Sequence, residues 1–535
     1  MSEVSAMNDQ RSASVMVSRF RRSLLGKPEL ARKAITSRLK AGLRVIPSGF
    51  LLAMHSAMWC GLQAGPAEPA VLKSGEAELF LDDYHLARTE NVRISLQPAI
   101  KCPANPLIRA DRPWESRTSH PSVIVDPSTG KFRMYYQARL NGDRVCYAES
   151  DDGIRWTKPG LELHAFGGHR RTNILLPDGD SLWVLPNPDP GAPADQRYLG
   201  FVGRVRNRIP LPNPRFPDKH RSLGYASGDG IHWQWVMETY FGQDTFMSAV
   251  WCPDDMRFRA YTRNWRDHED YGKLRYDPKQ AQFRVVDMME SPDFREWSAP
   301  KFLFETGVEE GAPLVQTYGL SVARYGSGFV GALSVLNIDE SVEGWHRGHQ
   351  NIQLAFSRNG VDWNRVANRS VFIRHGPEGA FDWGEAYYPA GILAHGDTTY
   401  CYYTGKSTLH KGPGDFAIGL ATLPRDRLMS LSQQDESRPG IIDTRVFRCE
   451  PGKLLVNVSG EGSLQVEVLD ADGRSLPGFV APASRLAPAG AIYQSVAWSS
   501  DRKMRTLADV GGLDAGIRLR FKLEGVRLHA FMVVE

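Results

Sequence analysis

The sequence contains few cysteines and little helical periodicity, and both features limit what the protein can be. Its 535 residues include six cysteines, none in a CxxC spacing and none beside a histidine at a ligand interval. Neither a zinc site nor a disulfide framework is therefore indicated. Between residues 75 and 440 apolar residues rarely recur at helical intervals. The 50 glycines, 34 prolines and 10% aromatic residues instead favour many short strands joined by tight turns.

Net charge is also small, at +4, and it is unevenly distributed. Residues 1–44 hold ten Lys and Arg residues against three acidic ones, which leaves the rest of the chain near neutral. A basic tail without a basic body argues against nucleic-acid binding.

An apolar run at residues 45–67 follows this tail and ends in small residues, as a secretory signal does. It is interrupted by a proline and polar residues, and no other segment could span a bilayer. We expect residues 1–70 to be a basic extension with this signal segment. The mature protein is then secreted or periplasmic, with a cytoplasmic protein as the alternative.

Internal repeats give the strongest indication of the fold. One turn motif occurs four times, as ESDDGIRW, SGDGIHW, SPDFREW and SRNGVDW (149–156, 227–233, 291–297 and 357–363). In such a turn the Asp or Asn bonds nearby backbone, Gly accepts a positive φ, and the Trp packs back against the sheet. We predict that the four tryptophans occupy equivalent positions.

Strands of alternating or continuous apolar residues surround each turn. A longer strand occurs in each of the five units and precedes the turn where one is present: GKFRMYYQAR, QRYLGFVGRV, MRFRAYTRNW, SGFVGALSVL and TTYCYYTGKS. A shorter strand stands upstream of each. Units of this length with three or four antiparallel strands are typical of propeller blades. The sequence therefore predicts an all-β chain with a five-bladed β-propeller at residues 75–431.

The pattern changes after the polar segment SQQDESRPG at 432–440. LQVEVLD and IRLRFKL alternate apolar with polar or charged residues, which indicates a half-exposed antiparallel sheet. We predict a C-terminal β-sandwich at residues 441–535.

A five-bladed propeller followed by a sandwich resembles the glycoside hydrolases of families 32 and 43. The repeated DG-x-x-W turns and the segment LFLDDY at 79–84 resemble uncharacterised bacterial proteins described as family 32-like. The resemblance implies three carboxylates at one end of the propeller funnel: a nucleophile or base, an orienting Asp and a general acid. Such chemistry needs one protonated and one ionised carboxyl group.

Candidates for these carboxylates stand upstream of the expected inner strands. Asp244 takes the place of the orienting Asp, Glu310 or Glu385 that of the acid, and Glu115 that of the nucleophile or base. Salt bridges with the many arginines are the structural alternative for the three glutamates.

Aromatic and basic residues near these positions could bind a sugar. The candidates for substrate binding are His120, Arg263, Trp114, Trp265 and Tyr387. No metal ligand and no cofactor is expected, although a structural calcium is left open.

The sequence thus predicts a glycoside hydrolase acting on a furanose-containing or related oligo- or polysaccharide. Because the signature motifs of family 32 are not intact, a non-catalytic carbohydrate-binding or scaffold propeller is one alternative. A sialidase-like hydrolase is the other, and it would require an arginine triad and a tyrosine nucleophile. The sugar, the linkage, the stereochemistry and the oligomeric state are left open.

Overall fold

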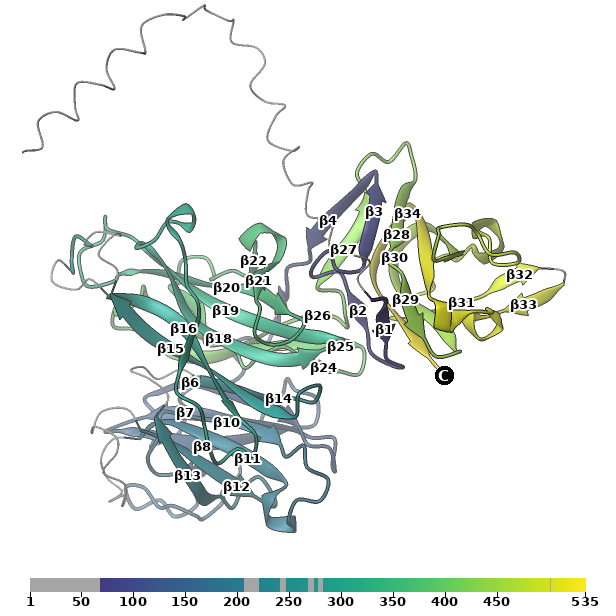
Figure 1. Ribbon diagram of the computed structural model, residues 1–535. Coiled ribbons are helices and arrows are strands. Elements are labelled where there is room, and N and C mark those ends of the chain that lie inside the picture. Colours follow the sequence, from purple (N-terminus) through teal and green to yellow (C-terminus); the bar gives the residue numbers. More distant parts are fainter. Residues whose placement is uncertain (1–67, 206–220, 241–246, 268–273, 278–281, 501) are drawn as a thin grey trace, which may run out of the picture. The chain divides into compact units, whose positions relative to one another are not determined.

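The computed structural model describes residues 68–205, 221–240, 247–267, 274–277, 282–500 and 502–535. These residues are almost entirely β-structure, as predicted, and their helical elements are short 3-10 turns (Figure 1). No helix in the described part of the chain is long and apolar enough to cross a membrane. The basic extension, with its signal segment, lies outside the described residues.

Three consecutive four-stranded antiparallel sheets correspond to the first three predicted units. They are β6 (Arg117–Val125), β7 (Phe132–Arg139), β8 (Asp143–Ser150) and β9 (Ile174–Leu176); β10 (Ser181–Pro186), β11 (Tyr198–Val205), β12 (Arg221–Ser227) and β13 (Gln234–Tyr240); and β14 (Met247–Cys252), β15 (Arg257–Asp267), β16 (Gln282–Ser291) and β17 (Lys301–Phe304).

The fourth and fifth predicted units share a single ten-stranded sheet. Its strands are β18 (Val315–Tyr325), β19 (Gly328–Ile338), β20 (Gly348–Ser357), β21 (Asn364–Arg365), β22 (Val371–Ile373), β23 (Glu385–Tyr387), β24 (Leu393–His395), β25 (Thr398–Lys406), β26 (Phe416–Pro424) and β5 (Ile100–Lys101). One parallel pairing, between Gln350 and Glu385, connects the two halves of this sheet. The structure therefore differs here from the prediction, which gave each of the five units a sheet of its own.

Buried hydroxyl groups bridge successive first strands of these units. The Ser122 hydroxyl of β6 accepts a hydrogen bond from Val184 N of β10 at 3.0 Å. The Ser248 hydroxyl of β14 donates to Leu320 O of β18 at 2.8 Å. Ser321 of β18 donates to Pro389 O, just after β23, at 2.6 Å.

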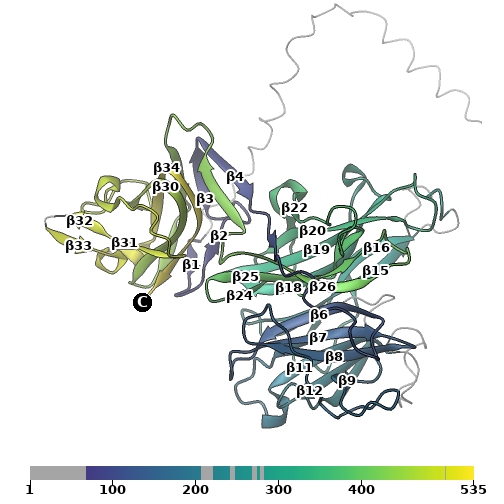
Figure 2. The same cartoon turned by 180° about the vertical axis from the view of Figure 1, so that it is seen from behind.

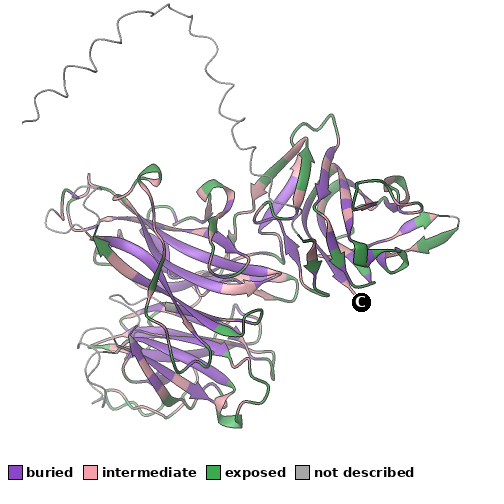
Figure 3. Ribbon diagram, viewed as in Figure 1, coloured by how far each residue is buried: buried purple, intermediate pink, exposed green. Residues whose placement is uncertain are grey.

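The series of contacts returns to its starting strand. His120 N of β6 donates to the Thr404 hydroxyl of β25 at 2.9 Å. Between β10 and β14 the bridging donor is the Trp183 indole, which reaches Ala249 O at 2.8 Å. Figures 1 and 2 show the four sheets from opposite sides, and Figure 3 shows that their central strands are mostly buried.

The C-terminal strands form a second ten-stranded sheet, which also takes in strands from the start of the described chain. Its members are β1 (Ala70–Leu72), β2 (Glu78–Leu79), β3 (Leu86–Glu90), β4 (Val92–Leu96), β27 (Met429–Gln433), β28 (Gly440–Thr444), β29 (Phe447–Cys449), β30 (Lys453–Asp470), β31 (Gln494–Val496) and β34 (Ile517–Val534). The hairpin β32 (Trp498–Ser500) and β33 (Lys503–Arg505) stands apart from it. The domain limits at 75–431 and 441–535 stay a prediction, but residues 70–96 contribute strands to this sheet.

Strand β34 shows the alternation that the sequence predicts. Ile517, Leu519 and Phe521 are buried, whereas Arg518 and Arg520 between them are half-buried. Side chains on a strand point alternately to opposite faces, so one face of this sheet packs on a core and the other contacts water.

The four repeated turns have the same hydrogen-bond network. In the first, the Asp152 carboxylate accepts from the backbone of Ile154 at 2.9 Å and of Arg155 at 2.8 Å. The Trp156 indole donates to Gly153 O at 3.2 Å, and Trp233, Trp297 and Trp363 make the corresponding bond at 3.2, 3.0 and 3.1 Å. The residue that accepts this bond has a positive φ in every turn. The predicted equivalence of the four tryptophans is confirmed.

This network makes the Asp152 side chain a structural element of its turn. We expect Asp152→Ala to lower the free energy of unfolding by about 1–2 kcal/mol, because two backbone N–H groups lose their acceptor. Asp151→Ala is the matched control, since that side chain is 85% exposed and contacts only Lys131 at 3.7 Å among the described residues. Urea denaturation would measure the difference, and equal midpoints for the two variants would contradict this assignment.

A buried histidine makes the C-terminal sheet sensitive to acid. His529 of β34 bonds Met429 O through Nδ1 and the Ser459 hydroxyl through Nε2, both at 2.8 Å. Burial lowers the pKa of His529 to about 4. Below pH 6.5 the unfolded chain therefore binds a proton that the folded chain does not, so stability falls as the pH falls towards 4.

We expect about 2–3 kcal/mol of stability to be lost between pH 6.5 and pH 4 through this histidine. His529→Gln should flatten the pH dependence of the urea midpoint, whereas His395→Gln, at an exposed position, should leave it as in the wild type. Identical pH profiles for the two variants would show that His529 does not titrate in this way.

Candidate functional site

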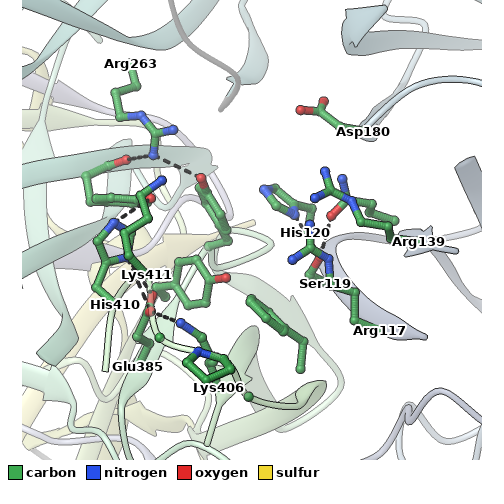
Figure 4. Close-up of a pocket in the computed structure, with 18 of the residues that line it drawn as sticks. Arg117, Ser119, His120, Arg139, Asp180, Arg263, Glu385, Lys406, His410 and Lys411 are labelled. Carbon is green, nitrogen blue, oxygen red and sulfur yellow. Dashed lines mark hydrogen bonds and ion pairs between the residues drawn. The ribbon is translucent and has the colours of Figure 1, made fainter. Parts of the chain in front are cut away.

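A cavity of about 630 Å³ opens at one end of the first four sheets (Figure 4). Its walls come from the starts of first strands, such as β6 and β18, and from the ends of second strands, such as β7 and β25. The lining residues are Arg117, Ser119, His120, Gln137, Arg139, Asp180, Arg263, Trp265, Arg284, Tyr318, Trp345, Glu385, Tyr387, Tyr388, Lys406, His410, Lys411, Gly412, Pro413, Gly414 and Phe416.

Basic side chains outnumber acidic ones in this lining. Four arginines and two lysines face two carboxylates, Asp180 and Glu385, among the described residues. Figure 4 shows Asp180, from the turn before β10, on the opposite side of the pocket from Glu385 of β23. Anionic groups are therefore favoured in this cavity by the field of its walls.

Glu385 is the centre of a buried polar cluster. Its carboxylate accepts from the Gln350 amide at 2.7 Å and from the Lys406 ammonium at 3.1 Å, and His410 Nδ1 lies 3.3 Å away. Glu385 and Lys406 are 1% and 2% exposed. A charge buried to this degree is tolerated because it is paired and hydrogen-bonded.

The cluster determines which of its members are charged. Burial alone would raise the pKa of Glu385, but His410 and Lys406 outweigh it and lower that pKa below its usual value. Burial lowers the pKa of His410 to about 4, so its imidazole is neutral near pH 7. Burial also lowers the pKa of Lys406, against the opposing charge of Glu385. The carboxylate of Glu385 is thus held ionised.

Aromatic rings and arginines form a second part of the wall. The Arg263 guanidinium donates to Tyr318 O at 3.0 Å and to the Tyr388 hydroxyl at 2.9 Å, and it lies 4.1 Å from the centre of the Tyr318 ring. Arg284 lies 4.3 Å from the Trp265 ring centre and donates to the Gln316 amide oxygen at 2.7 Å. These contacts fix the rings that face the cavity.

His120 stands at an irregular point of β6. The register of β6 against β7 shifts between Ser119 and Ser122, and His120 has a φ of 52°. Its ring packs on Tyr388 at 3.9 Å between centroids, and Tyr388 has a φ of 43°. Left-handed backbone in non-glycine residues and β-bulges both concentrate at functional sites.

Five of the candidate residues from the sequence line this one cavity: Glu385, His120, Arg263, Trp265 and Tyr387. Asp244, the first catalytic candidate, lies outside the described residues, and its role stays a prediction.

Glu115, Glu310 and Trp114 do not line the cavity. The Glu115 carboxylate is buried in bonds to Lys158 and to the Tyr136 hydroxyl, both at 2.7 Å. Trp114 donates to the Asn173 amide at 2.8 Å.

Glu310 pairs with Arg365 at 2.9 Å and with Arg369 at 3.0 Å. Ion pairing with basic residues is the structural alternative to catalysis that the sequence left open for these glutamates.

The lining residues that the sequence did not single out include Arg117, Arg284, Tyr318, Lys406 and His410. Their positions at the starts and ends of predicted strands are the sequence feature that could have identified them. Arg117 and Tyr318 stand near the start of a first strand, and Lys406 ends a second strand.

In the described part of the chain, no three His, Cys, Asp or Glu side chains gather in a way that could hold a metal ion. The thiols of Cys146 and Cys401 are fully buried, and the five described cysteines are unpaired.

No family model and no curated protein matches the sequence. The chain is similar to a solved glycosyl hydrolase from Bacteroides ovatus, at 13% identity over 61% of this chain and 94% of that one, with a TM-score of 0.41. It is similar to the catalytic domain of the Coprinopsis cinerea GH62 α-L-arabinofuranosidase, at 11% identity over 62% and 96%, with a TM-score of 0.36. It is also similar to a thermostable family-43 glycoside hydrolase, at 13% identity over 58% of this chain and 91% of that one, with a TM-score of 0.36.

Glycoside hydrolases, a family-43 enzyme among them, are thus among the structures to which the chain is similar. Similarity to family 32 stays a prediction.

Because Glu385 and Lys406 are buried together, removing one leaves the other charge without compensation. We expect Glu385→Gln and Lys406→Met each to lower the free energy of unfolding by about 3–5 kcal/mol. The double variant should lose less than the two single losses added together, since neither charge then remains. A denaturant double-mutant cycle measures this coupling, and additive losses would contradict the ion pair.

Proposed function

We propose that the protein is a glycoside hydrolase acting on a furanose-containing or related glycan in this cavity. The observation that supports it most is the placing of Glu385 and Asp180 on opposite walls of one pocket (Figure 4). Hydrolysis of a glycosidic bond requires one carboxylate that attacks or activates water and one carboxyl group that donates a proton. A substrate between the two walls would meet both.

The proposed roles follow from the charges. Glu385 is the ionised partner, as nucleophile or base, because Lys406 and His410 lower its pKa. This assignment replaces the role of general acid that the sequence suggested for Glu385. Asp180 is then the proposed proton donor, and Asp244 keeps the orienting role that the sequence predicts. Trp265 and Trp345 also line the cavity, and the rings of such residues can contact a sugar.

We further propose that the first four sheets form a propeller of five blades, with the shared ten-stranded sheet counting as two. The bridges from β6 through β10, β14 and β18 back to β6 support this arrangement. An oligo- or polysaccharide would then enter at the end where the first strands begin.

A sialidase-like hydrolase is the second candidate, because four arginines and three tyrosines line the same cavity. Tyr387 lies two residues after Glu385 on β23, so both side chains leave the strand on one face. Burial and then the charge of Glu385 raise the pKa of Tyr387. A tyrosine nucleophile would therefore need to give its proton to a base, and Glu385, on the same face of β23, is the candidate for that base.

Screening aryl glycofuranosides, neutral glycopyranosides and aryl sialosides tests both candidates. We expect the wild type to cleave at least one class, and Glu385→Gln to reduce kcat/KM by 10²-fold or more, the scale of an acid–base partner. Glu378→Gln, at an exposed position on the same connection, is the control that should keep wild-type activity.

The double variant Glu385→Gln, Lys406→Met separates loss of chemistry from loss of folding, because it removes both buried charges. It should remain inactive while recovering stability. Saturable glycan binding without turnover of any substrate would favour the non-catalytic alternative, and full activity of a folded Glu385 variant would exclude the proposed role.

A further inference from the structure

Arg117 stands out within the cavity because its charge is not matched by the protein. The side chain is half-buried at the start of β6 and packs over the Phe416 ring at 4.8 Å. Its Nε is buried without a hydrogen-bond partner, and among the described residues its guanidinium makes no hydrogen bond or ion pair. A buried, unsatisfied donor on a permanent cation costs stability unless another group binds there.

The neighbouring strand increases this cost. Arg117 of β6 and Arg139 of β7 are directly opposed in the strand register, and like charges in that relation destabilise a sheet. Asp143 is the nearby carboxylate, and it already binds Arg139 through both of its oxygens. Arg139 is thus paired directly, whereas the charge of Asp143 acts on Arg117 without a direct contact.

The pKa of His120 shows the same excess of positive charge around this residue. Burial lowers the pKa of His120 well below 6.5, and the charges of Arg117, Arg263 and Arg139 lower it further. Figure 4 shows His120, Ser119, Arg117 and Arg139 together on the wall opposite Glu385. A neutral imidazole and a hydroxyl therefore stand beside the Arg117 guanidinium.

We propose that Arg117 binds an oxyanion group of the substrate, so that this cavity selects acidic saccharides. The inference rests on the proposed function in taking the ligand to be a saccharide. A guanidinium presents paired N–H donors that match a carboxylate or a sulfate, and such charge-assisted bonds are the stronger kind. His120, whose Nδ1 bonds the Ser119 hydroxyl at 3.0 Å, lines the cavity beside that group. Glu385, which is hydrogen-bonded to Lys406 on the opposite wall, keeps its proposed role as nucleophile or base.

Isothermal titration calorimetry with four probes tests the proposal: a hexuronate, a hexose 6-sulfate, the neutral hexose and inorganic phosphate. We expect the hexuronate or the sulfate to bind at least 10-fold more tightly than the neutral hexose. Arg117→Gln should abolish this preference, and Arg117→Lys should retain part of it because the charge remains. Arg171→Gln removes the same charge from a side chain that is 80% exposed and outside the cavity, so it should leave the preference intact.

A second measurement does not depend on any ligand. Arg117→Gln relieves the opposed charges of β6 and β7, so the free protein should melt at the same or a higher temperature, and protection by the hexuronate against thermal unfolding should be lost. Equal binding of acidic and neutral sugars, or an unchanged preference in Arg117→Gln, would overturn the proposal.

The phosphate arm identifies the source of the anion. Phosphate that the hexuronate and the sulfate displace competitively supports one oxyanion site, whereas phosphate that they fail to displace shows a site for a free anion and overturns the saccharide assignment. Because binding is measured without turnover, a protein that hydrolyses nothing can still show the charge preference. Conversely, a protein that hydrolyses neutral glycans would contradict the preference for acidic saccharides and leave the proposed hydrolase function intact.

Discussion

Buried hydroxyl groups that bridge neighbouring sheets are the constraint on which the site depends. Ser122, Ser248, Ser321 and Thr404 are at most 3% exposed, and each bonds the backbone of the neighbouring unit or receives a bond from it. Small side chains let the strands approach closely, and the bonds satisfy polar groups that would otherwise be costly to bury. The strands that converge in this way also carry the lining residues at their starts.

The convergence of strands explains how so much positive charge is held in one place. Arginines from β6, β7, β15 and β16 reach the same cavity because their strands begin or end there. Contacts with a tyrosine ring, a tryptophan ring and Asp143 hold Arg263, Arg284 and Arg139. The buried cores of these sheets offset the destabilising effect of the opposed Arg117 and Arg139 charges. A site that costs stability in the free protein gains it on binding an anion, which is the usual relation between strain and function.

The sequence predicted the parts of this fold that depend on short-range chemistry. The turns around Asp152 and the alternation in β34 follow from residue types within a few positions, and both are confirmed. The candidate carboxylates were harder to place because their environment depends on distant segments. Glu115 meets Lys158, 43 residues away, whereas Glu385 meets Lys406 across a strand pair. Nothing local in the sequence distinguishes a structural ion pair from a catalytic one.

The electrostatics of the cavity also restrict where a catalytic proton can come from. Glu385 is held ionised, and His410, with a pKa of about 4, carries no proton to donate as an acid near pH 7. Glu385 and His410 can therefore accept a proton near pH 7, but neither of these two groups is a source of one. In the proposed reaction a general acid would act from the other side, where Asp180 stands. This asymmetry between the two walls is the ground on which we propose Glu385 as the base and a carboxyl group of the other wall as the acid.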